Sequence, residues 1–373
     1  DITFYLFLVL VYFSFIILLM PLLEKFKQLS ISIYHLSTRN KINYVFYSEK
    51  ENYKYYFLPL INKLINENQE IYYLSSELSD LIASNNLKVK NFYIGKGFIR
   101  MIILSLIKCK YFFMTITDLG NNEFYKSKKI NNYIYIFHAL QSTHKIYTEK
   151  AFDNYDTICC NGNYQCEEIK IREGKFNLRK KKLVKSGYLY LEYLKSNINL
   201  SKDKNYILFA PSWNYNNFNL LEKFSIEILN QLLKDNFKVI FRPHQEHYKR
   251  SKRTIDDIFL KFRENSNLII DQSPNNLKSF EQSNFLITDY SGIVHEFLYI
   301  CKRPFIVFDD LKKVHNENYY KIKDGSFEED VYKKFGFFIN STSIKNIKEN
   351  VLKAKLKFNE KEKEIENFFS ERL

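Results

Sequence analysis

Glycine, proline and tryptophan are scarce in this chain of 373 residues, which contains 9, 6 and 1 of them. Lysine, asparagine, isoleucine, tyrosine and phenylalanine are abundant instead, so the formal charge of +14 follows a bias that runs through the whole chain. We therefore do not interpret this charge as a sign of a nucleic-acid partner. With 46% hydrophobic residues the chain can build two domains with ordinary cores, and its length excludes a small peptide-like scaffold.

The cysteines lack the spacing of a zinc site. Cys109, Cys159, Cys160, Cys166 and Cys301 form no CxxC pair, and no histidine cluster lies near them. Their odd number favours reduced thiols in a cytosolic domain. No carboxylate cluster of the DxD type requires a metal ion, so neither a metal site nor a cofactor is predicted.

Near the N-terminus stands a long apolar run, ITFYLFLVLVYFSFIILLMPLL, without one charged residue. About 20 such residues cross a bilayer as a helix, so we predict a transmembrane anchor over residues 1–24. The alternatives are a signal peptide, for which the run is too long and lacks a cleavage site, and a core helix, which is rarely so uniformly apolar. Because Lys25, Lys27, Arg39 and Lys41 follow the run, the remaining chain is expected on the cytoplasmic face of the cell membrane.

After this run, short apolar segments alternate with longer amphipathic ones. The alternation is typical of β-α units around mostly parallel sheets, so the predicted fold class is α/β. A helix is predicted over residues 54–66. The expected strands lie at residues 42–47, 70–75, 87–93, 111–116, 133–138, 156–161, 206–212, 237–244, 267–271, 285–291 and 304–310.

A polar segment without periodicity, residues 195–205, is interpreted as a linker between two domains. The predicted domains are residues 40–195 and residues 205–342. Residues 343–373 form a charged amphipathic pattern, which predicts a C-terminal helix that crosses back over the first domain.

The stretch FLITDYSGIVHE places polar residues where a buried strand ends and a helix begins. Ligands of open α/β sheets bind at this edge, and a helix start points N–H groups and its dipole at an anion. Ser291 can cap the helix or donate to a phosphate oxygen, and Gly292 lets the backbone approach a ligand. Asp289 and Glu296 suit sugar hydroxyls. The alternative is that Asp-Tyr-Ser-Gly is only an N-cap and a turn.

A second strand end, FKVIFRPH, places Arg242, Pro243 and His244 at the same edge of the predicted sheet. The guanidinium fits a phosphate, proline fixes the turn, and the imidazole can donate a hydrogen bond. A surface histidine at a strand end is the alternative for His244. We interpret His247 and Lys249 as solvated.

In the first half, the strand YIYIF delivers His138, with Ser142 and His144 after it in HALQSTH. Across a cleft from the phosphate-binding residues, His138 would be a general base for an acceptor hydroxyl. Either histidine could instead be a satisfied interior or surface residue. The strand ILFAPSW adds the Ser212 hydroxyl and the Trp213 ring at the rim, or is simply a strand end with a packing tryptophan.

These four motifs, HALQSTHKIY, FAPSW, RPH and DYSGIVHEFLYICKRPFIVFD, resemble the CDP-glycerol glycerophosphotransferase family over residues 138–320. The resemblance implies a GT-B-like fold of two Rossmann-like domains facing across a cleft, and a role in building teichoic acids, capsules or related surface polymers. The chain departs from the family pattern at two places. Many members have His-Gly where this chain has His138-Ala139, and two serines where it has Ser291-Gly292.

The resemblance further implies a metal-independent transfer of glycerol phosphate or ribitol phosphate from a CDP-linked donor to a hydroxyl of a lipid-linked or polysaccharide acceptor, with release of CMP. His138 and His244 would be catalytic, with Ser142 and His144 on the acceptor side. The donor would contact Ser212, Arg242, Asp289, Ser291, Gly292 and Glu296. The basic residues 170–185 and the anchor would hold the enzyme at the membrane, unless the basic run is only a solvated loop.

Two other classes of function stay open. One is a GT-B glycosyltransferase that uses a nucleotide sugar. The spacing of Ser291, Gly292 and Glu296 also resembles the donor site of such enzymes. A membrane-tethered binding protein would bind CDP without turning it over. Release of CMP from CDP-glycerol or CDP-ribitol would distinguish the transferase of polyol phosphate from both.

Overall fold

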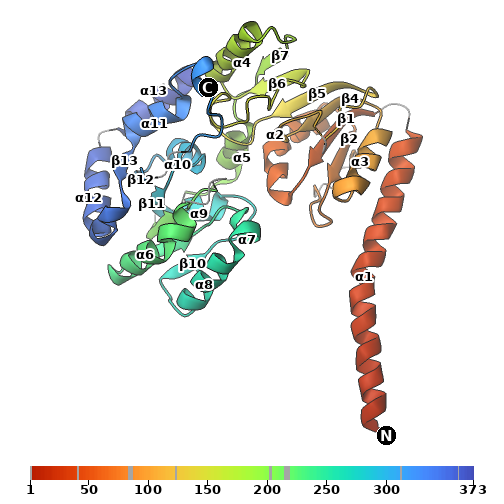
Figure 1. Cartoon of the computed structure of the whole chain (residues 1–373), viewed down its shortest axis with the longest axis horizontal. Helices are drawn as coiled ribbons and strands as arrows, with labels where there is room; N and C mark the ends of the chain where they lie inside the picture. Colours follow the sequence, from red (N-terminus) through yellow and green to blue (C-terminus); the bar gives the residue numbers. More distant parts are fainter. Residues whose placement is uncertain are drawn as a thin grey trace. The chain divides into compact units, whose positions relative to one another are not determined.

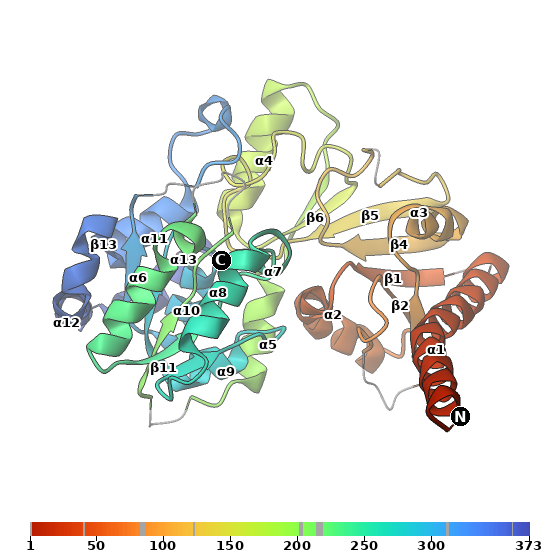
Figure 2. The same ribbon diagram turned by 60° about the horizontal axis from the view of Figure 1, so that its bottom comes forward.

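The chain folds into two parallel sheets with helices packed around them, which confirms the predicted α/β fold class (Figure 1 and Figure 2). The contacts divide it into two compact units, Asp1–Ile136 with Phe152–Cys159, and Phe137–Ala151 with Cys160–Leu373. The segment Phe137–Ala151 therefore groups with the second unit, although it follows a strand of the first sheet. The computed structural model describes residues 2–39, 42–82, 87–121, 124–200, 204–213, 219–310, 313–359 and 361–373, and of residues 2–19 and 362 it describes the backbone alone.

The first sheet has the strand order β3-β2-β1-β4-β5-β6-β7. The registered pairs from β3 to β6 are parallel, and the buried aromatic residues of β1, β2 and β4 form much of its core. Its strands are β1 (Ile42–Ser48), β2 (Ile71–Ser75), β3 (Val89–Tyr93), β4 (Cys109–Met114), β5 (Ile130–Ile136), β6 (Thr157–Cys160) and β7 (Lys182–Lys185), and the helices of the first unit are α1 (Ile2–Thr38), α2 (Lys54–Asn66) and α3 (Gly97–Leu106).

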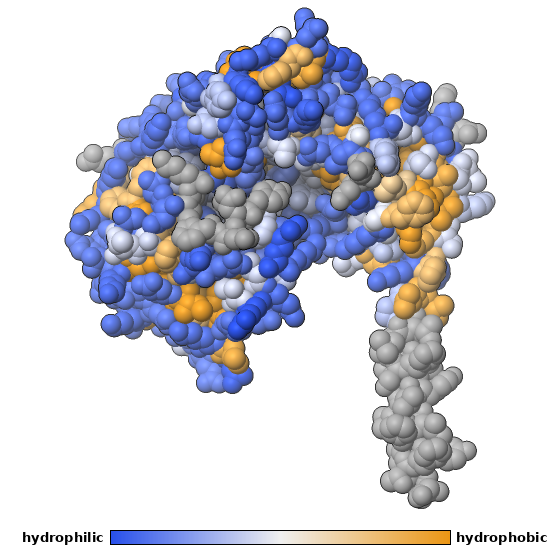
Figure 3. Space-filling model, in the orientation of Figure 1, coloured by the Kyte–Doolittle hydropathy of each residue, from blue (hydrophilic) through white to orange (hydrophobic). Residues whose placement is uncertain are grey.

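The end of α1 nearer the sheet packs against β3 and α3. Leu36 is fully buried, and the Ser32 hydroxyl donates a 2.7 Å hydrogen bond to the Tyr93 carbonyl. Figure 3 shows apolar side chains exposed over α3 and the adjoining part of α1. The predicted anchor falls mainly on residues 2–19, whose side chains lie outside those described. In the part of the chain that the structure does describe, no helix is both long enough and apolar enough to cross a membrane.

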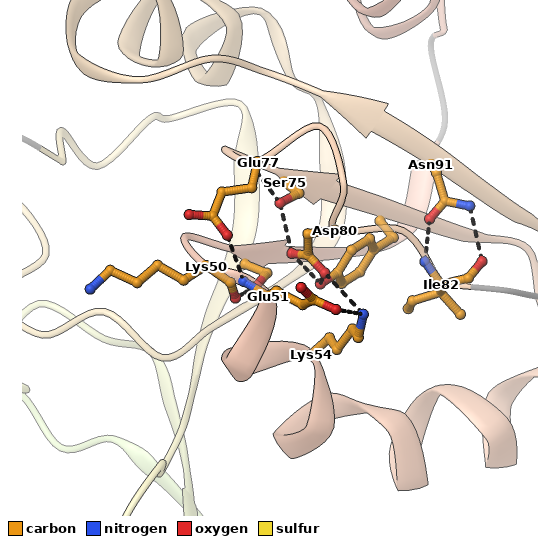
Figure 4. Close-up of polar contacts among 10 residues, drawn as sticks. Lys50, Glu51, Lys54, Ser75, Glu77, Asp80, Ile82 and Asn91 are labelled. Carbon is orange, nitrogen blue, oxygen red and sulfur yellow. Dashed lines mark hydrogen bonds and ion pairs between the residues drawn. The ribbon is translucent and has the colours of Figure 1, made fainter. Parts of the chain in front are cut away.

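A polar cluster ties the carboxyl end of β2 to the start of α2 (Figure 4). The carboxylate of the fully buried Asp80 accepts hydrogen bonds from the Tyr73 hydroxyl, at 2.8 and 3.0 Å, and from the Ser75 hydroxyl, at 2.7 Å. Lys54 lies 3.9 Å from it. Burial raises the pKa of Asp80, although these hydrogen bonds and the lysine lower it in part. Because these partners come from both β2 and α2, the cluster stabilises the first unit.

The second sheet has the strand order β10-β9-β8-β11-β12-β13, with every pair parallel. The chain passes from β8 outward to β10, then returns to β11 beside β8 and continues to β13. The order of the strands therefore reverses between β8 and β11, where ligands of doubly wound sheets bind. The strands are β8 (Tyr206–Phe209), β9 (Lys238–Phe241), β10 (Leu268–Ile270), β11 (Ser283–Thr288), β12 (Phe305–Phe308) and β13 (Phe337–Ile339).

Helices cover the second sheet and bury one continuous apolar core with it. In α6 the apolar residues recur at helical spacing, and Asn219 caps its start by accepting a 3.0 Å hydrogen bond from the Glu222 amide. The helices of this unit are α4 (Asn163–Lys175), α5 (Leu189–Asn197), α6 (Leu220–Lys234), α7 (His247–Arg250), α8 (Lys252–Phe262), α9 (Leu277–Gln282), α10 (Ile293–Cys301), α11 (Phe327–Phe335), α12 (Ile347–Phe358) and α13 (Glu362–Arg372).

The C-terminal region is two helices, α12 and α13, rather than the single helix predicted. The ring of Phe369 in α13 packs on Tyr299 in α10, with centroids 5.0 Å apart. A Cβ atom on Gly162, just before α4, would lie 2.0 Å from the Arg372 carbonyl, so only glycine fits there. The compact units do not follow the predicted division at residues 195–205, because α4 and α5 group with the second unit. The predicted domain boundaries stay a prediction.

Candidate active site

Two residues that were predicted to bind the CDP-linked donor lie together where the strand order of the second sheet reverses. Ser212 follows β8 and Asp289 follows β11, and these strands are neighbours. The Asp289 carboxylate accepts hydrogen bonds from the Ser212 amide at 2.8 Å and from the Ser212 hydroxyl at 2.9 Å. Both residues are buried. The structure thus brings them together, and they bind each other across the two strand ends.

His247, expected to be solvated, is fully buried beneath this pair. Its Nε2 lies 3.0 Å from the Ser212 carbonyl oxygen and its Nδ1 lies 3.3 Å from the Ser251 hydroxyl. Burial lowers the pKa of His247, so the imidazole favours its neutral form. The expectation was wrong because α7 turns His247 inward, beneath the end of β8, whereas Lys249 is exposed as predicted.

Arg242 directs its guanidinium into the protein. Nη1 donates to Asp271 at 2.8 Å, Nη2 donates to the Ser273 carbonyl at 2.9 Å, and Nε donates to the Asn276 side chain at 2.9 Å. Burial raises the pKa of the Asp271 carboxyl, but the charge of Arg242 and bonds from serines outweigh it, and the pKa is lowered. In this arrangement Arg242 organises the loop after β10.

Glu296 is the next member of this hydrogen-bonded chain. Its carboxylate accepts from the Asn276 amide at 2.7 Å and from the Tyr188 hydroxyl at 2.8 Å. Burial raises its pKa to about 7, against the opposing effect of these donors and of Arg242. Glu296 is therefore a buried carboxyl that can exchange a proton near neutral pH.

His244, two residues after Arg242, is exposed. Its Nδ1 accepts a 3.2 Å hydrogen bond from the Glu246 amide, and its own amide donates to the Pro211 carbonyl at 3.3 Å. A ring nitrogen that accepts carries no proton, so the neutral imidazole bears its proton on Nε2. His244 can thus donate from Nε2 at the carboxyl edge of the sheet.

The predicted phosphate-binding turn leads into α10 without a side-chain cap. Gly292 is the N-cap residue, with φ of −60°, and it has no side chain that could cap the helix. The Ser291 carbonyl accepts a 3.0 Å hydrogen bond from the Tyr332 hydroxyl of α11. The turn is thereby tied to α11 through its main chain rather than through the serine hydroxyl.

The His138 segment lies against this turn. A Cβ atom on Gly292 would meet the Ala139 Cβ at 3.6 Å and the Gln141 side chain at 3.8 Å, both ordinary contact distances. β5 ends at Ile136, so His138 comes two residues after the strand, where it is half-buried with its ring edge-to-face to Tyr147. The second unit therefore holds His138, its following loop and the start of α10 in one place.

The predicted acceptor-side residues are buried. Ser142 donates to Glu328 of α11 from its amide, at 2.9 Å, and from its hydroxyl, at 2.7 Å. His144 is 5% exposed, and its Nδ1 lies 3.3 Å from the carboxylate of Glu168 in α4. Neither side chain is presented on the surface of the described structure.

Sequence patterns did not reveal three charged residues near these segments. Glu168 and Glu328 lie in amphipathic helices, where a glutamate is normally solvated. Lys313 lies near Asp289, whose charge raises the pKa of the ammonium, although burial outweighs it and lowers that pKa overall. No motif or spacing marks any of the three. Among the residues with described placement, no group of three or more His, Cys, Asp or Glu could hold a metal ion.

Solved structures share the architecture of this chain. The wall teichoic acid polymerase TagF is 16% identical, with a TM-score of 0.58 over 95% of this chain and 90% of that chain. A variant of that polymerase soaked with CDPG has a TM-score of 0.56 at 16% identity and the same coverage. A UDP-GlcNAc 2-epimerase from Methanocaldococcus jannaschii is 16% identical, with a TM-score of 0.50 over 84% of this chain and 91% of that chain. This likeness shows a GT-B-like fold.

No match was found among curated proteins. A family model does match, that of CDP-Glycerol:Poly(glycerophosphate) glycerophosphotransferase, and it spans residues 33–323. This span includes both sheets up to β12 and every predicted site residue. The chain therefore belongs to the CDP-glycerol:poly(glycerophosphate) glycerophosphotransferase family, whose enzymes transfer a polyol phosphate from a CDP-linked donor.

Proposed function

We propose that this enzyme transfers glycerol phosphate or ribitol phosphate to a hydroxyl of a lipid-linked or surface-polysaccharide acceptor, with His138 and the start of α10 as the two halves of its active site. The observation that carries this proposal is the packing of the His138 segment against Gly292, where an added Cβ atom would lie 3.6 Å from the Ala139 Cβ. A base and an anion-binding helix start are thereby neighbours within one unit.

In the proposed reaction, the acceptor oxygen attacks the phosphorus that bears the polyol. The bond from this phosphorus to the bridging oxygen breaks, and CMP leaves with the electron pair. His138 takes the proton of the acceptor hydroxyl. Phosphoryl transfer needs mainly alignment and neutralisation of charge, so a positioned base and fixed donors are sufficient protein chemistry.

The pyrophosphate would lie at the start of α10, where backbone amides and the helix dipole favour an anion. The Ser291 hydroxyl, directly before the N-cap residue Gly292, would donate to a phosphate oxygen. The Nε2–H of His244 would donate a hydrogen bond to the phosphates, and the ammonium of Lys313 would add positive charge. Arg242, Ser212 and Asp289 would act indirectly, because their polar groups hold the loops that shape this edge.

Glu296 would accept hydrogen bonds from the ribose hydroxyls of the nucleotide. Its carboxylate oxygens accept one bond each from Asn276 and Tyr188, which leaves a lone pair on each oxygen. Ser142 and His144 were predicted on the acceptor side. Because they are buried, they would act from the protein interior and shape the loop that carries His138.

The test is to incubate the purified chain with CDP-glycerol, CDP-ribitol, a UDP-sugar and a CMP-sugar, each with a panel of hydroxyl-bearing acceptors, and to measure nucleotide release. We expect CMP from a CDP-polyol and a polyol phosphate attached to the acceptor. Turnover of nucleotide sugars alone would mean a glycosyltransferase. Binding of CDP without turnover on any acceptor would mean a binding protein.

We also propose that α1 holds the enzyme at the cytoplasmic face of the cell membrane. The proposal is supported by the uncharged run of residues 2–23 and by the basic residues Lys25 and Lys27 directly after it. Met20, Leu23 and Phe26 of α1 are more than half exposed, as is Phe98 of α3, and an apolar surface of this kind favours a lipid boundary. The basic residues 170–185 remain either a second contact with anionic lipid or a solvated face.

Membrane fractionation of the whole chain and of a variant without residues 1–23 tests this attachment. The whole chain should sediment with membranes and resist a high-salt wash, and the shortened chain should be released while it still turns over a CDP-polyol. An equal membrane fraction for both chains would contradict the proposed role of α1.

A further inference from the structure

The segment after His138 is held in place almost residue by residue by side chains of other elements. The Ala139 carbonyl accepts from Asn161 at 2.9 Å, and the Gln141 carbonyl accepts from Gln165 at 2.9 Å. The Thr143 amide and hydroxyl donate to Glu168 at 2.6 and 2.7 Å. This segment has no regular secondary structure, so side chains from other parts of the chain hold it in place.

Glu328 completes this set of bonds from α11. It is 4% exposed, and both of its carboxylate oxygens accept hydrogen bonds from Ser142. The two bonds, one to each oxygen of a single carboxyl group, fix the orientation of Ser142. Glu168, which binds Thr143, is a second buried carboxylate that holds this segment.

The same face of α11 also holds the phosphate-binding turn. Tyr332 lies four residues after Glu328, so the two side chains project from one side of the helix. The Tyr332 hydroxyl donates to the Ser291 carbonyl at 3.0 Å, and its ring packs edge-to-face on Tyr290 with centroids 5.1 Å apart. One rigid helix therefore contacts both the loop of the proposed base and the turn of the proposed anion site.

We infer that Glu328 is a positioning residue, which acts with Tyr332 on α11 to fix the distance from His138 to the start of α10. This inference rests on the proposed role of His138. A shift of about 1 Å in a reacting group can cost about 100-fold in rate, so bonds that set this distance affect turnover even though they touch no substrate.

The experiment is a double-mutant cycle on the whole chain, with CMP release from a CDP-polyol measured at saturating donor and acceptor. Glu328→Ala should lower kcat by about 10- to 100-fold and leave the Kd of CDP unchanged. Glu328→Gln should recover most of this loss, because its amide oxygen still accepts from the Ser142 amide and its amino group can donate to the hydroxyl. In a His138→Ala background, Glu328→Ala should cause no further loss, because it acts through His138.

Glu173 in α4 offers a matched control. It is a buried carboxylate that accepts a 2.9 Å hydrogen bond from the Lys181 amide, on a loop outside the proposed site. Glu173→Ala should lower the melting temperature without lowering kcat per folded molecule. Ser142→Ala, which removes one bond and leaves Glu328 in place, gives a milder test if Glu328→Ala does not fold.

The outcomes separate the inference from the proposed function. If the unmodified chain does not turn over a CDP-polyol, the proposed function is wrong. If it does, and if Glu328→Ala or Ser142→Ala keeps the full kcat in folded protein, the positioning role is wrong. An equal loss from Glu328→Ala with and without His138 would also overturn it, because the effect would then not pass through the base.

Discussion

Two segments that meet at the candidate active site are held by different means. The turn that begins at Asp289 follows β11 and is fixed by Ser212, from the end of the neighbouring strand. The loop after His138 is fixed by Glu168 and Glu328, from two helices 25 and 186 residues further along the chain. The first arrangement follows from the strand order, whereas the second depends on how helices pack. Motif residues at a strand end can therefore be scaffold, and residues that belong to no motif can shape the active site.

The largest effect is expected from the proposed base. Because general-base catalysis contributes about 10²- to 10⁴-fold, His138→Ala should lower the turnover of a CDP-polyol by about that factor. The affinity for CDP should stay nearly the same, since the anion site is carried by other segments. His35→Ala, an exposed histidine on α1, is the matched control and should keep normal turnover. Near-normal kcat in folded His138→Ala protein would make this histidine structural.

Arg242 and His244 test whether a motif residue is scaffold or part of the active site, because they share one motif and differ in burial. Arg242→Ala leaves the buried Asp271 without its cation, so the free energy of unfolding should fall by about 3 kcal/mol. His244→Ala should change it by less than about 0.5 kcal/mol while it weakens donor binding and turnover. Denaturant unfolding and CMP release, measured on both variants, check these expectations. A stable Arg242→Ala protein with lost donor binding would mean that the guanidinium contacts the donor directly.

Glu296 should make stability depend on pH. Its pKa is about 7 in the folded protein against an ordinary 4.5, so between these values the folded state keeps a proton that the unfolded state has released. The free energy of unfolding should then fall as pH rises from 4.5 to 7. Glu296→Gln removes this titration, so the stability of the unmodified chain should decline relative to the variant over that range. Parallel stability curves for the two proteins would contradict a raised pKa.

The smallest effect is expected at Gly292. Its φ of −60° is open to any residue, and an added Cβ would meet Ala139 and Gln141 only at ordinary contact distances. Gly292→Ser, which restores the two serines of the family pattern, should therefore leave the melting temperature nearly unchanged and keep turnover. Gly162→Ser is the contrast, because a Cβ there would lie 2.0 Å from the Arg372 carbonyl and should destabilise the C-terminal packing. Equal losses for both would mean that the His138 loop is closer to α10 than described.

The sequence was a good guide to what depends on local pattern. The helix predicted over residues 54–66 is α2, and all eleven predicted strands correspond to strands of the two sheets, although most bounds shift by a few residues. Two short strands, β7 and β13, were missed. β7 begins and ends with lysine and none of its residues is buried, so it lacks the apolar pattern of the other strands. The position of Ser212, Asp289 and Ser291 at one edge of the sheet was also predictable, because the carboxyl ends of parallel strands meet at the same edge.

The partners of buried polar groups could not be predicted in the same way. Nothing in the sequence around Glu328 distinguishes it from a solvated glutamate of an amphipathic helix, and its partner Ser142 lies 186 residues away. Arg242 was expected to point at a phosphate, which its charge suits, but Asp271 and Asn276 supply the same complementarity inside the protein. Charge and motif identify a residue's chemistry, whereas only the packing of the chain decides which partner satisfies it.

The most direct test of the account is a crystal structure of the chain with CDP-glycerol bound. We expect the pyrophosphate at the start of α10, within hydrogen-bond distance of Ser291 and of His244 Nε2, the ribose near Glu296, and the glycerol phosphate directed at His138. A nucleotide bound elsewhere, such as at the carboxyl edge of the first sheet, would contradict the proposed site and the roles assigned to these residues.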